Sequence, residues 1–447
     1  MSLPRYPAYK PSGVEWLGEV PEHWEVLPLK REFDVVGGST PKSDIQEYWD
    51  GDIQWITPAD LSRLQSFEIT ESIRAITAEG LNSCGTTMVP SGSVVVSTRA
   101  PIGSLGIAGI DLCTNQGCKA LVPIDQISSR FTAYFLGIAT EALNVRGRGA
   151  TFLEISGDEL GAFKVTLPPC QEQVQIATFL DHETAKIDAL IAEQQRLIEL
   201  LQEKRQAVIS HAVTKGLNPN APIKDSGVEW LGEVPEHWEL SRVKVISSFT
   251  TSGPRGWSEQ ISEDGALFVQ SGDLNDYLGV DFEDCKRVRV SGDAEALRTR
   301  LQPGDAVVCI TGAKTGNAAV CHELPEDSYI NQHLCLIRPR NNIEPGFLGL
   351  LLKSHCGQTH FALAQYGLKQ GLSLENVRET PLVLPPMKEQ VEIVSYVNKV
   401  RGFMRSLINE SHHSVEILKE RRSALISAAV TGQIDVRGLV EAEGGEQ

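Results

Sequence analysis

The stretch SGVEWLGEVPEHWE at residues 12–25 occurs a second time, letter for letter, at residues 226–239. The copies begin 214 residues apart in a chain of 447 residues, so the repeat is close to half of the protein. Repeats of about 20–50 residues indicate solenoids, whereas a repeat of this length indicates two whole domains. The sequence therefore predicts a duplicated protein, in which the tryptophans of each copy anchor the chain to a domain.

The duplication returns towards the end of each half. LPPCQEQV at residues 167–174 matches LPPMKEQV at residues 384–391, and AVISHAVT at residues 207–214 matches ALISAAVT at residues 424–431, both with an offset of 217. The long inserts between the repeated segments have little in common. A repeated frame around changed inserts predicts two domains that do the same work on different targets.

Composition predicts an ordinary globular protein of about two to four domains, because 41% of the residues are apolar and 22% are charged. The N-terminal residues lack the apolar core of a signal peptide, and no apolar run is long enough to span a membrane. Nine cysteines without a framework spacing predict reduced thiols in the cytoplasm. Their spacing matches no zinc motif, so we expect no metal site.

The net charge of −17 argues against a chain that binds DNA phosphates alone. DNA responds to the local field, however, because salt screens charges beyond about 8–10 Å. Basic residues do gather in the inserts, at Arg146 and Arg148, at residues 286–289 (KRVR) and at Arg298 and Arg300. The balance favours a subunit whose hold on nucleic acid is shared with partners.

Two segments are predicted to be long helices, because residues 171–213 contain no glycine or proline and residues 388–430 contain only Gly402. Apolar residues recur with a period of seven along both, as in a coiled coil. Two matched helices, one per half, more naturally pair antiparallel about a pseudo-two-fold axis than lie separately on their own domains. The expected seam consists of Leu180, Ile187, Leu190, Leu197, Leu201, Val208, Ile393, Val397, Val400, Met404, Leu407, Leu418 and Leu425.

The inserts are predicted to be mixed domains of helices and strands with one shared fold. Apolar, β-branched stretches at residues 94–96 and 307–310 follow turn signals and are typical of strands. Each is followed by a glycine-rich loop and then by an Asn-Gln pair, at residues 115–116 and 331–332. The expected fold class is therefore α/β (α+β), with two similar globular domains joined by two long helices.

No catalytic constellation stands out. GAKT at residues 312–315 resembles the end of a phosphate-binding loop, but it lacks the Gly-Lys pair and the upstream glycine of that motif. DCK at residues 284–286 resembles half of a nuclease site, and the first half of the chain has nothing equivalent. The motifs of an adenine methyltransferase are missing as well. We therefore expect no enzymatic activity and no cofactor.

These features resemble a specificity subunit of a type I restriction–modification system. The resemblance rests on the repeated segment, on the two LPPxxEQ segments and on KIDALIAEQQRLIELLQEKRQAVISHAVTKGL at residues 186–217, and it covers nearly the whole chain. The parts that it implies are an N-terminal segment (1–26), a first target-recognition domain (27–169), a first spacer helix (170–217), the repeated segment (218–240), a second target-recognition domain (241–386), a second spacer helix (387–432) and a flexible acidic tail (433–447).

The resemblance also implies a function. Each recognition domain would read one half of a bipartite site in double-stranded DNA, and the helix pair would set the length of the unread spacer. Two methyltransferase subunits would dock on the repeated regions, and two restriction subunits would join through the complex. The chain itself would be non-catalytic, cytoplasmic and without contact to a membrane.

Base recognition needs side chains of fixed hydrogen-bonding geometry in the major groove, such as arginine for guanine and asparagine or glutamine for adenine. Loops that follow strands are the expected carriers, and some of their basic residues would contact phosphates instead of bases. The candidates are Arg99, Arg146, Arg148, Lys286, Arg287, Arg289, Lys314, Lys369 and Gln370.

A second interpretation stays open, namely a scaffold unrelated to DNA in which two globular arms on a coiled coil hold protein partners. It explains the repeat, the helices and the acidity, and it explains the divergent inserts less well. A fused methyltransferase–nuclease is disfavoured by its missing motifs and by the chain length. DNA binding in the presence of a methyltransferase partner distinguishes the first two interpretations.

Overall fold

The structure is a computed structural model that describes residues 3–99, 101–147, 154–365 and 371–439. Its mixture of sheets and helices confirms the α/β (α+β) class. Within these ranges, no helix is long and apolar enough to cross a membrane.

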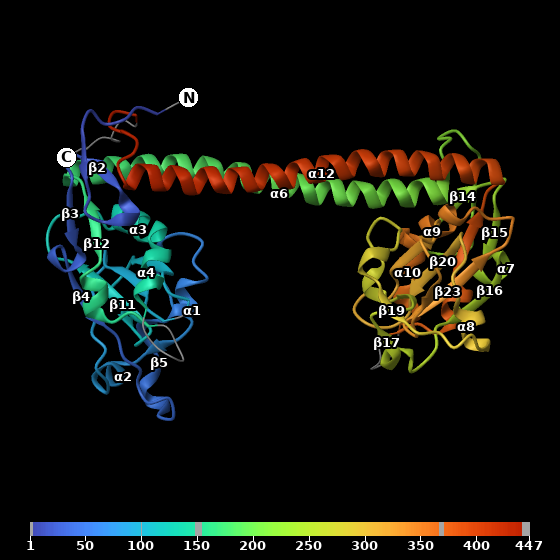
Figure 1. The fold of residues 1–447 in the computed structure, drawn as a ribbon, viewed down its shortest axis with the longest axis horizontal. Helices are drawn as coiled ribbons and strands as arrows, with labels where there is room; N and C mark the ends of the chain where they lie inside the picture. The colour runs from blue at the N-terminus through green and yellow to red at the C-terminus, as the bar shows by residue number, and fades with distance from the viewer. Residues whose placement is uncertain (1–2, 100, 148–153, 366–370, 440–447) are drawn as a thin grey trace. The chain divides into compact units, whose positions relative to one another are not determined.

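The chain divides into two compact units. Unit 1 consists of residues 1–194 and 413–447, and unit 2 consists of residues 195–412. The division falls inside the two long helices, α6 (Cys170–Lys215) and α12 (Met387–Val430), so each helix contributes to both units. Unit 1 thus contains both ends of the chain, which are marked in Figure 1.

Unit 1 is built on a five-stranded sheet with the order β4-β11-β8-β9-β6. A second sheet has the order β10-β5-β7, and two further pairs join β1 to β2 and β3 to β12. The strands are β1 (Tyr9–Pro11), β2 (Glu19–Pro21), β3 (Glu25–Pro28), β4 (Phe33–Gly37), β5 (Trp49–Ile56), β6 (Glu68–Ile69), β7 (Ala75–Ile76), β8 (Val94–Ser97), β9 (Leu105–Ala108), β10 (Cys113–Thr114), β11 (Cys118–Pro123) and β12 (Lys164–Leu167).

Unit 2 repeats this plan. Its main sheet, β16-β23-β20-β21, corresponds in order to β4-β11-β8-β9, and its second sheet, β17-β19-β18-β22, again contains one parallel pair. The strands are β13 (Ile223–Asp225), β14 (Glu233–Pro235), β15 (Glu239–Arg242), β16 (Ser247–Ser252), β17 (Ile261–Ser262), β18 (Ala266–Val269), β19 (Lys286–Val288), β20 (Asp305–Cys309), β21 (Ala318–Cys321), β22 (Ser328–Ile330), β23 (Leu334–Pro339) and β24 (Pro381–Leu384). Both inserts therefore share one fold, as predicted.

Short helices accompany the sheets in both units. They are α1 (Pro58–Leu61), α2 (Ala78–Asn82), α3 (Ser129–Ile138), α4 (Thr140–Arg146) and α5 (Gly157–Gly161) in unit 1, and α7 (Val243–Ile246), α8 (Ala294–Thr299), α9 (Pro345–Lys353), α10 (His355–Ala364) and α11 (Leu374–Arg378) in unit 2. Turns of 3-10 helix lie at Glu15–Leu17, Leu29–Arg31, Gln46–Tyr48, Trp257–Gln260, Ser271–Asp273 and Phe282–Asp284.

The central strands β8 and β20 explain the layers of each unit. Both are buried along their whole length, as continuous β-branched runs predict. Successive side chains of a strand point to opposite faces. In unit 1, Val94 and Val96 accordingly join the core that contains α3 and α6, while Val95 joins the core beneath the second sheet.

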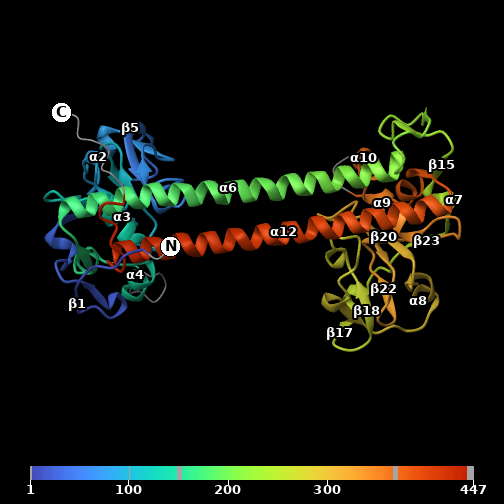
Figure 2. The ribbon, with the colours of Figure 1, turned by 90° about the horizontal axis from the view of Figure 1, so that it is seen from above.

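Helices α6 and α12 run in opposite directions within unit 1 (Figure 2). Thr166, just before α6, donates a hydrogen bond from its Oγ1 to the carbonyl of Val430 at 2.8 Å. Further along α6, Asp188 forms an ion pair with Arg422 at 2.8 Å. As the residue number increases along α6, the number of the facing residue on α12 decreases. The predicted antiparallel pairing is therefore confirmed within unit 1.

The same direction holds within unit 2. Val213, near the end of α6, shares a core with Ile393, near the start of α12. Arg205 and Arg405, which lie nearer the middle of each helix, both place their guanidinium groups over the ring of Tyr277. The pairing is therefore antiparallel within this unit as well.

The observed seam differs in part from the predicted one. Leu190 and Leu197 are 52% and 41% exposed, so their assignment to the seam is wrong. The buried row passes through Thr184 and Ile198 instead. The predicted seam places the next inward position three residues after Leu180 and the following one four residues later. In the structure these two spacings are four and then three residues. The other predicted positions are buried (Leu180, Ile187, Ile393, Val397 and Met404) or half-buried (Leu201, Val208, Val400, Leu407, Leu418 and Leu425).

Residues 433–439 do not form the expected flexible tail. Val436 is buried in the core of unit 1, and the backbone N–H of Asp435 donates to the carbonyl of Pro4 at 2.8 Å. The guanidinium of Arg437 lies 4.9 Å from the ring centroid of Tyr6. Apolar side chains at residues 434 and 436 give this segment a face to bury, which its acidic composition concealed.

Candidate nucleic-acid interface

A buried tryptophan ties the repeated segment to each unit. Trp24 donates from Nε1 to Glu172 Oε1 at 3.0 Å, and Trp238 donates from Nε1 to Glu389 Oε2 at 3.0 Å. The two glutamates belong to the LPPxxEQ segments, so the two kinds of repeat are joined to each other. Trp24 and Trp238 are thus anchors, as predicted. Trp230 also packs against the core of unit 2, and Trp16, although 41% exposed, packs on Phe135 and Phe163.

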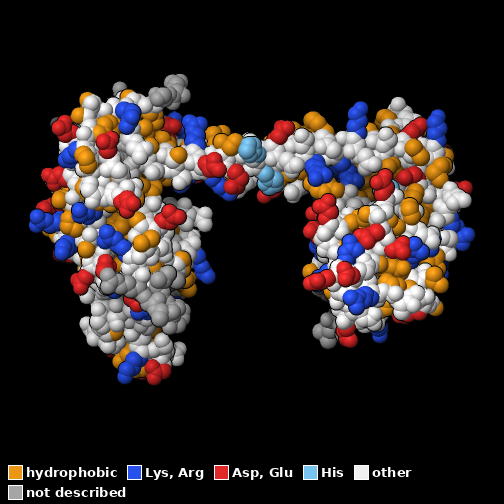
Figure 3. All heavy atoms as spheres, in the orientation of Figure 1, with side chains coloured by type: hydrophobic (Ala, Val, Ile, Leu, Met, Phe, Trp, Pro, Cys, Tyr) orange, Lys and Arg blue, Asp and Glu red, His pale blue; other side chains and the backbone are white. Residues whose placement is uncertain are grey.

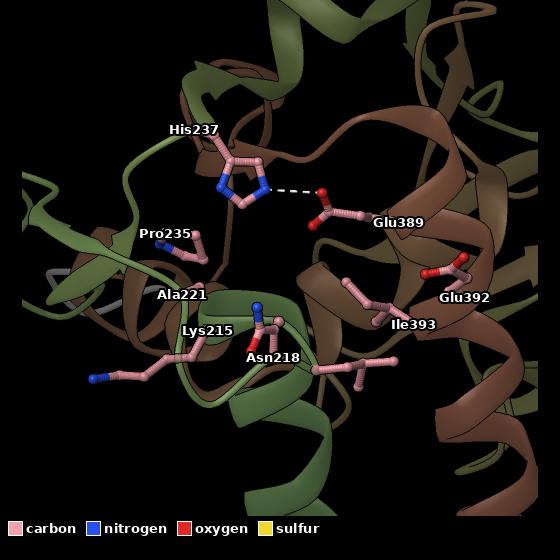
Figure 4. A pocket seen from close by; sticks show the side chains of 10 residues that line it. Lys215, Asn218, Ala221, Pro235, His237, Glu389, Glu392 and Ile393 are labelled. Carbon is pink, nitrogen blue, oxygen red and sulfur yellow. Dashed lines mark hydrogen bonds and ion pairs between the residues drawn. The ribbon is translucent and has the colours of Figure 1, made fainter.

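The surroundings of the two glutamates differ. Glu172 also accepts a hydrogen bond from the hydroxyl of Tyr6 at 2.6 Å, and burial together with this carboxylate raises the pKa of Tyr6. Glu389 instead borders an open cavity of about 450 Å³, which Figure 4 shows between His237 and the start of α12. Lys215 and Asn218, from the end of α6 and the turn after it, line the same cavity.

The candidates of the first recognition domain have neighbours within the protein. Arg99 follows β8 and forms an ion pair with Glu154 at 3.1 Å. Arg146, the last residue of α4, lies 5.0 Å from the ring centroid of Phe163, so part of its surface is used in packing. Arg148 lies outside the described residues.

Three candidates of the second recognition domain lie on or beside β19. Arg287 is held by Glu326 through two hydrogen bonds of 2.6 and 2.9 Å, and this carboxylate raises its pKa. Lys286 and Arg289 are exposed. Because strand side chains alternate, Lys286 points to the face opposite to Arg287.

Lys314, also exposed, follows β20 and donates a hydrogen bond to the carbonyl of Gly272 at 3.0 Å. Lys369 and Gln370 lie outside the described residues. Across the part of the chain that the structure describes, no group of three or more His, Cys, Asp or Glu side chains could hold a metal ion.

A group of cations that the spacing of residues in the sequence does not reveal lies in unit 2, where α6 and α12 meet the second recognition domain. The guanidinium carbons of Arg205 and Arg405 lie 5.5 and 4.5 Å from the ring centroid of Tyr277. Lys353 ends α9 and donates to the carbonyl of Asn275 at 3.4 Å. The residues that we call the Tyr277 cluster are Tyr277, Arg205, Lys314, Lys353, Arg401 and Arg405.

The cations of the Tyr277 cluster repel one another. The pKa of Lys353 is lowered to about 8, first by burial and then by the positive charges of Arg401, Arg205 and Lys314. Burial and Arg205 also lower the pKa of Arg401. The opposing carboxylate is Asp276, whose exposed side chain lies 3.9 Å from Lys353. Positive charge is therefore concentrated here without full compensation.

The cluster had one sequence signal. Arg205 and Arg401 stand on the inward rows of the two long helices, where apolar residues are the rule. Arg205 and Arg401 lie near Lys314, Lys353 and Tyr277 only because the chain folds. These three residues belong to two loops and to the end of α9, which are far apart in the sequence, so spacing alone could not reveal the cluster.

Two segments of the chain, residues 21–201 and 235–416, match the family model described as "Type I restriction modification DNA specificity domain". The chain belongs to this family. The two matched segments also correspond to the duplication, one in each half of the specificity subunit.

Similar proteins cover the specificity subunit almost completely. It is 26% identical over 431 residues to the type I restriction enzyme MjaIX specificity subunit of Methanocaldococcus jannaschii, a match that spans 95% of this chain and 96% of that protein. It is 21% identical over 448 residues to the EcoKI specificity subunit of Escherichia coli strain K12, which spans 95% and 92% of the two chains.

Two solved structures share the fold. One is a chain from a study of complex assembly and conformational transition of the type I R-M system, with a TM-score of 0.71, 16% identity and coverage of 94% of this chain and 99% of that one. The other is the HsdS subunit from Thermoanaerobacter tengcongensis, with a TM-score of 0.56, 16% identity and coverage of 93% and 98%.

Proposed function

We propose that this specificity subunit directs a type I restriction–modification complex to a bipartite site in double-stranded DNA, with each recognition domain (residues 27–169 and 241–386) reading one half of that site. The observation that carries the proposal is that the two inserts share a strand order in their main sheets although their sequences differ. One scaffold presented twice with different side chains suits two different half-sites. The chain is the specificity component and not the catalytic one.

Partner subunits dock on the repeated regions. Val174 and Val391 directly follow the two LPPxxEQ segments at equivalent positions, and both side chains are exposed. Exposed apolar residues at matched positions suit two copies of one partner. We assign these surfaces to two methyltransferase subunits, with two restriction subunits joining through the complex in the cytoplasm, where the DNA lies.

Among the candidate DNA contacts, Lys286, Arg289 and Lys314 are exposed and available to bases or phosphates. Arg99 and Arg287 would need to exchange their glutamate partners for DNA. Arg146 would keep its contact with Phe163 while its N–H groups face outwards. Arg148, Lys369 and Gln370 stay sequence-based candidates.

The spacer length provides the test of this function. Insertion of one heptad after Leu190 in α6, with a second at the equivalent position after Leu407 in α12, adds about 10 Å to each helix at 1.5 Å per residue. We expect both half-sites to stay the same and the spacer to grow by about three base pairs, given a rise of 3.4 Å per base pair. Genome-wide mapping of methylated adenines measures both quantities.

The control carries Leu190→Gln and Leu407→Gln without any insertion, and its spacer should not change. An unchanged spacer in the insertion variant would show that the helix pair does not measure the site. Absence of any sequence-specific DNA binding by the assembled complex, seen in a gel-shift assay, would favour the scaffold interpretation instead.

A further inference from the structure

The Tyr277 cluster points to a DNA contact that is separate from base reading. We propose that it binds phosphates of the duplex beside the second recognition domain, independently of sequence, and that the matching junction in unit 1 does not. This inference rests on the proposed function, because DNA is the ligand in both. Figure 3 shows basic side chains gathered where the helix pair meets this domain.

The local charge of the Tyr277 cluster favours an anionic ligand. The cluster brings together five cationic side chains, and Asp276 is the carboxylate that lies within ion-pair distance of one of them, among the residues that the structure describes. The chain as a whole has a net charge of −17. A positive island in an acidic protein is stabilised when an anion binds there, since the anion relieves the mutual repulsion of the cations.

The matching junction in unit 1 lacks this excess of positive charge. An offset of 217 residues aligns the helices of the two halves, so Asp188 corresponds to Arg405 and Arg422 corresponds to Arg205. In unit 1 these two positions form an ion pair at 2.8 Å. In unit 2 both positions are arginine, and both arginines lie on Tyr277. A neutral pair in one half has thus become a double positive charge in the other.

A second acidic position has changed in the same way. Asp181 of unit 1 forms an ion pair with Arg130 at 2.8 Å and accepts a hydrogen bond from the hydroxyl of Tyr134. Its counterpart in unit 2 is Asn398, which is uncharged. Thr184 corresponds to Arg401, which adds one more positive charge. The junction of unit 2 is therefore cationic at the places where unit 1 is neutralised.

The geometry favours phosphate groups as the ligand. The loop that carries Tyr277 is fixed by Asn275, whose Oδ1 accepts hydrogen bonds from the backbone N–H groups of Tyr277 and Gly279, both at 2.9 Å. Stacking on an aromatic ring orients a guanidinium while its N–H groups stay free for a bidentate contact with phosphate.

The test measures how DNA affinity depends on salt. The full chain, assembled with its methyltransferase subunits, is compared with the Arg205→Gln/Arg405→Gln double variant on a duplex that contains the methylated site and on a scrambled duplex. Each lost phosphate contact lowers the slope of log affinity against log salt by about 0.9. We expect a loss of about 1.8 on both duplexes, with an unchanged preference between them.

Two control variants define the outcome. Arg205→Lys/Arg405→Lys keeps both charges and should retain most of the salt slope, whereas Arg422→Gln removes the equivalent arginine of unit 1 and should leave the slope unchanged. A folded, assembled double variant with the wild-type slope would overturn the inference and leave the proposed function intact. Loss of methyltransferase subunits with unaltered DNA affinity would also overturn it, because the cluster would then serve an acidic protein surface. A wild-type complex without sequence preference would refute the proposed function itself.

Discussion

Glu172 and Glu389 hold the same place in the two halves but have different numbers of partners. Glu172 is buried and accepts hydrogen bonds from Tyr6 and Trp24, with His23 at 2.9 Å. Glu389 is partly exposed beside the open cavity. Removing a buried acceptor leaves its donors without partners, and the cost rises with their number and burial. The same residue type should therefore contribute unequally to the stability of the two units.

Glu172→Ala should lower the free energy of unfolding of unit 1 by about 2–3 kcal/mol, because two buried donors, Tyr6 and Trp24, lose their acceptor at once. Glu389→Ala is the matched control in unit 2 and should cost about 1 kcal/mol, since Trp238 is the one buried donor that loses its acceptor while the other partner, His237, is exposed. Urea titration followed by hydrogen exchange in each unit measures both effects. Equal losses would contradict the unequal roles of the two glutamates.

At the scale of elements, the long helices could be predicted well, because two segments that contain no proline and only one glycine, Gly402, and that end in a repeated sequence leave few alternatives. Their ends lie within two residues of the predicted limits, at Cys170–Lys215 and Met387–Val430. The seam could not be read with equal accuracy. Leu190 and Leu197 belong to an apolar row that is as regular as the buried row. The two rows lie one residue apart along the helix, and only contacts with the facing helix decide which of them is buried.

The adjacent residues Leu197 and Ile198 test this register. Ile198 is buried and Leu197 is 41% exposed. Ile198→Ala should destabilise unit 2 by about 2 kcal/mol, because it leaves a cavity between the helices. Leu197→Ala should change stability by less than about 0.5 kcal/mol, as is usual for exposed positions. Chemical denaturation of the two variants gives the comparison, and a larger loss for Leu197→Ala would restore the predicted row.

The candidate DNA contacts were less predictable than the frame. Positive residues of the inserts can be found in the sequence, but the partner of each one cannot, and Arg287 proved to be held by Glu326. The Tyr277 cluster joins the two helices to loops of the second recognition domain, so it exists only after folding. Sequence repeats reveal the shared scaffold of the two units. The cluster of positive charge that distinguishes unit 2 from unit 1 depends on tertiary contacts.

At the scale of the whole molecule, unit 1 is built from both ends of the chain. Its core contains Ile176 and Leu180 from α6 together with Ala429 and Val430 from α12 and Val436 beyond it. The first recognition domain therefore depends on residues that are more than 200 positions away in the sequence. Substitutions near the C-terminus should act on the first half-site.

Val436→Asp tests this dependence. Val436 is 1% exposed, so an unpaired carboxylate there should destabilise unit 1 by about 3 kcal/mol or more and make it sensitive to protease. Leu439→Asp, three residues later at a side chain that is 47% exposed, is the control and should have little effect. Limited proteolysis with identification of the cleavage sites measures the response, and cleavage confined to unit 2 would contradict the prediction.

The arrangement of unit 1 has a consequence for how the protein is made. A ribosome that translates the chain from its first residue completes residues 195–412 before it reaches the strip of α12 that covers Ile176 and Leu180. The first recognition domain therefore cannot complete the core around Ile176 and Leu180 until residues 429–436 have been synthesised. Domains usually mature in the order of synthesis, and here the first one to emerge is the last to be finished.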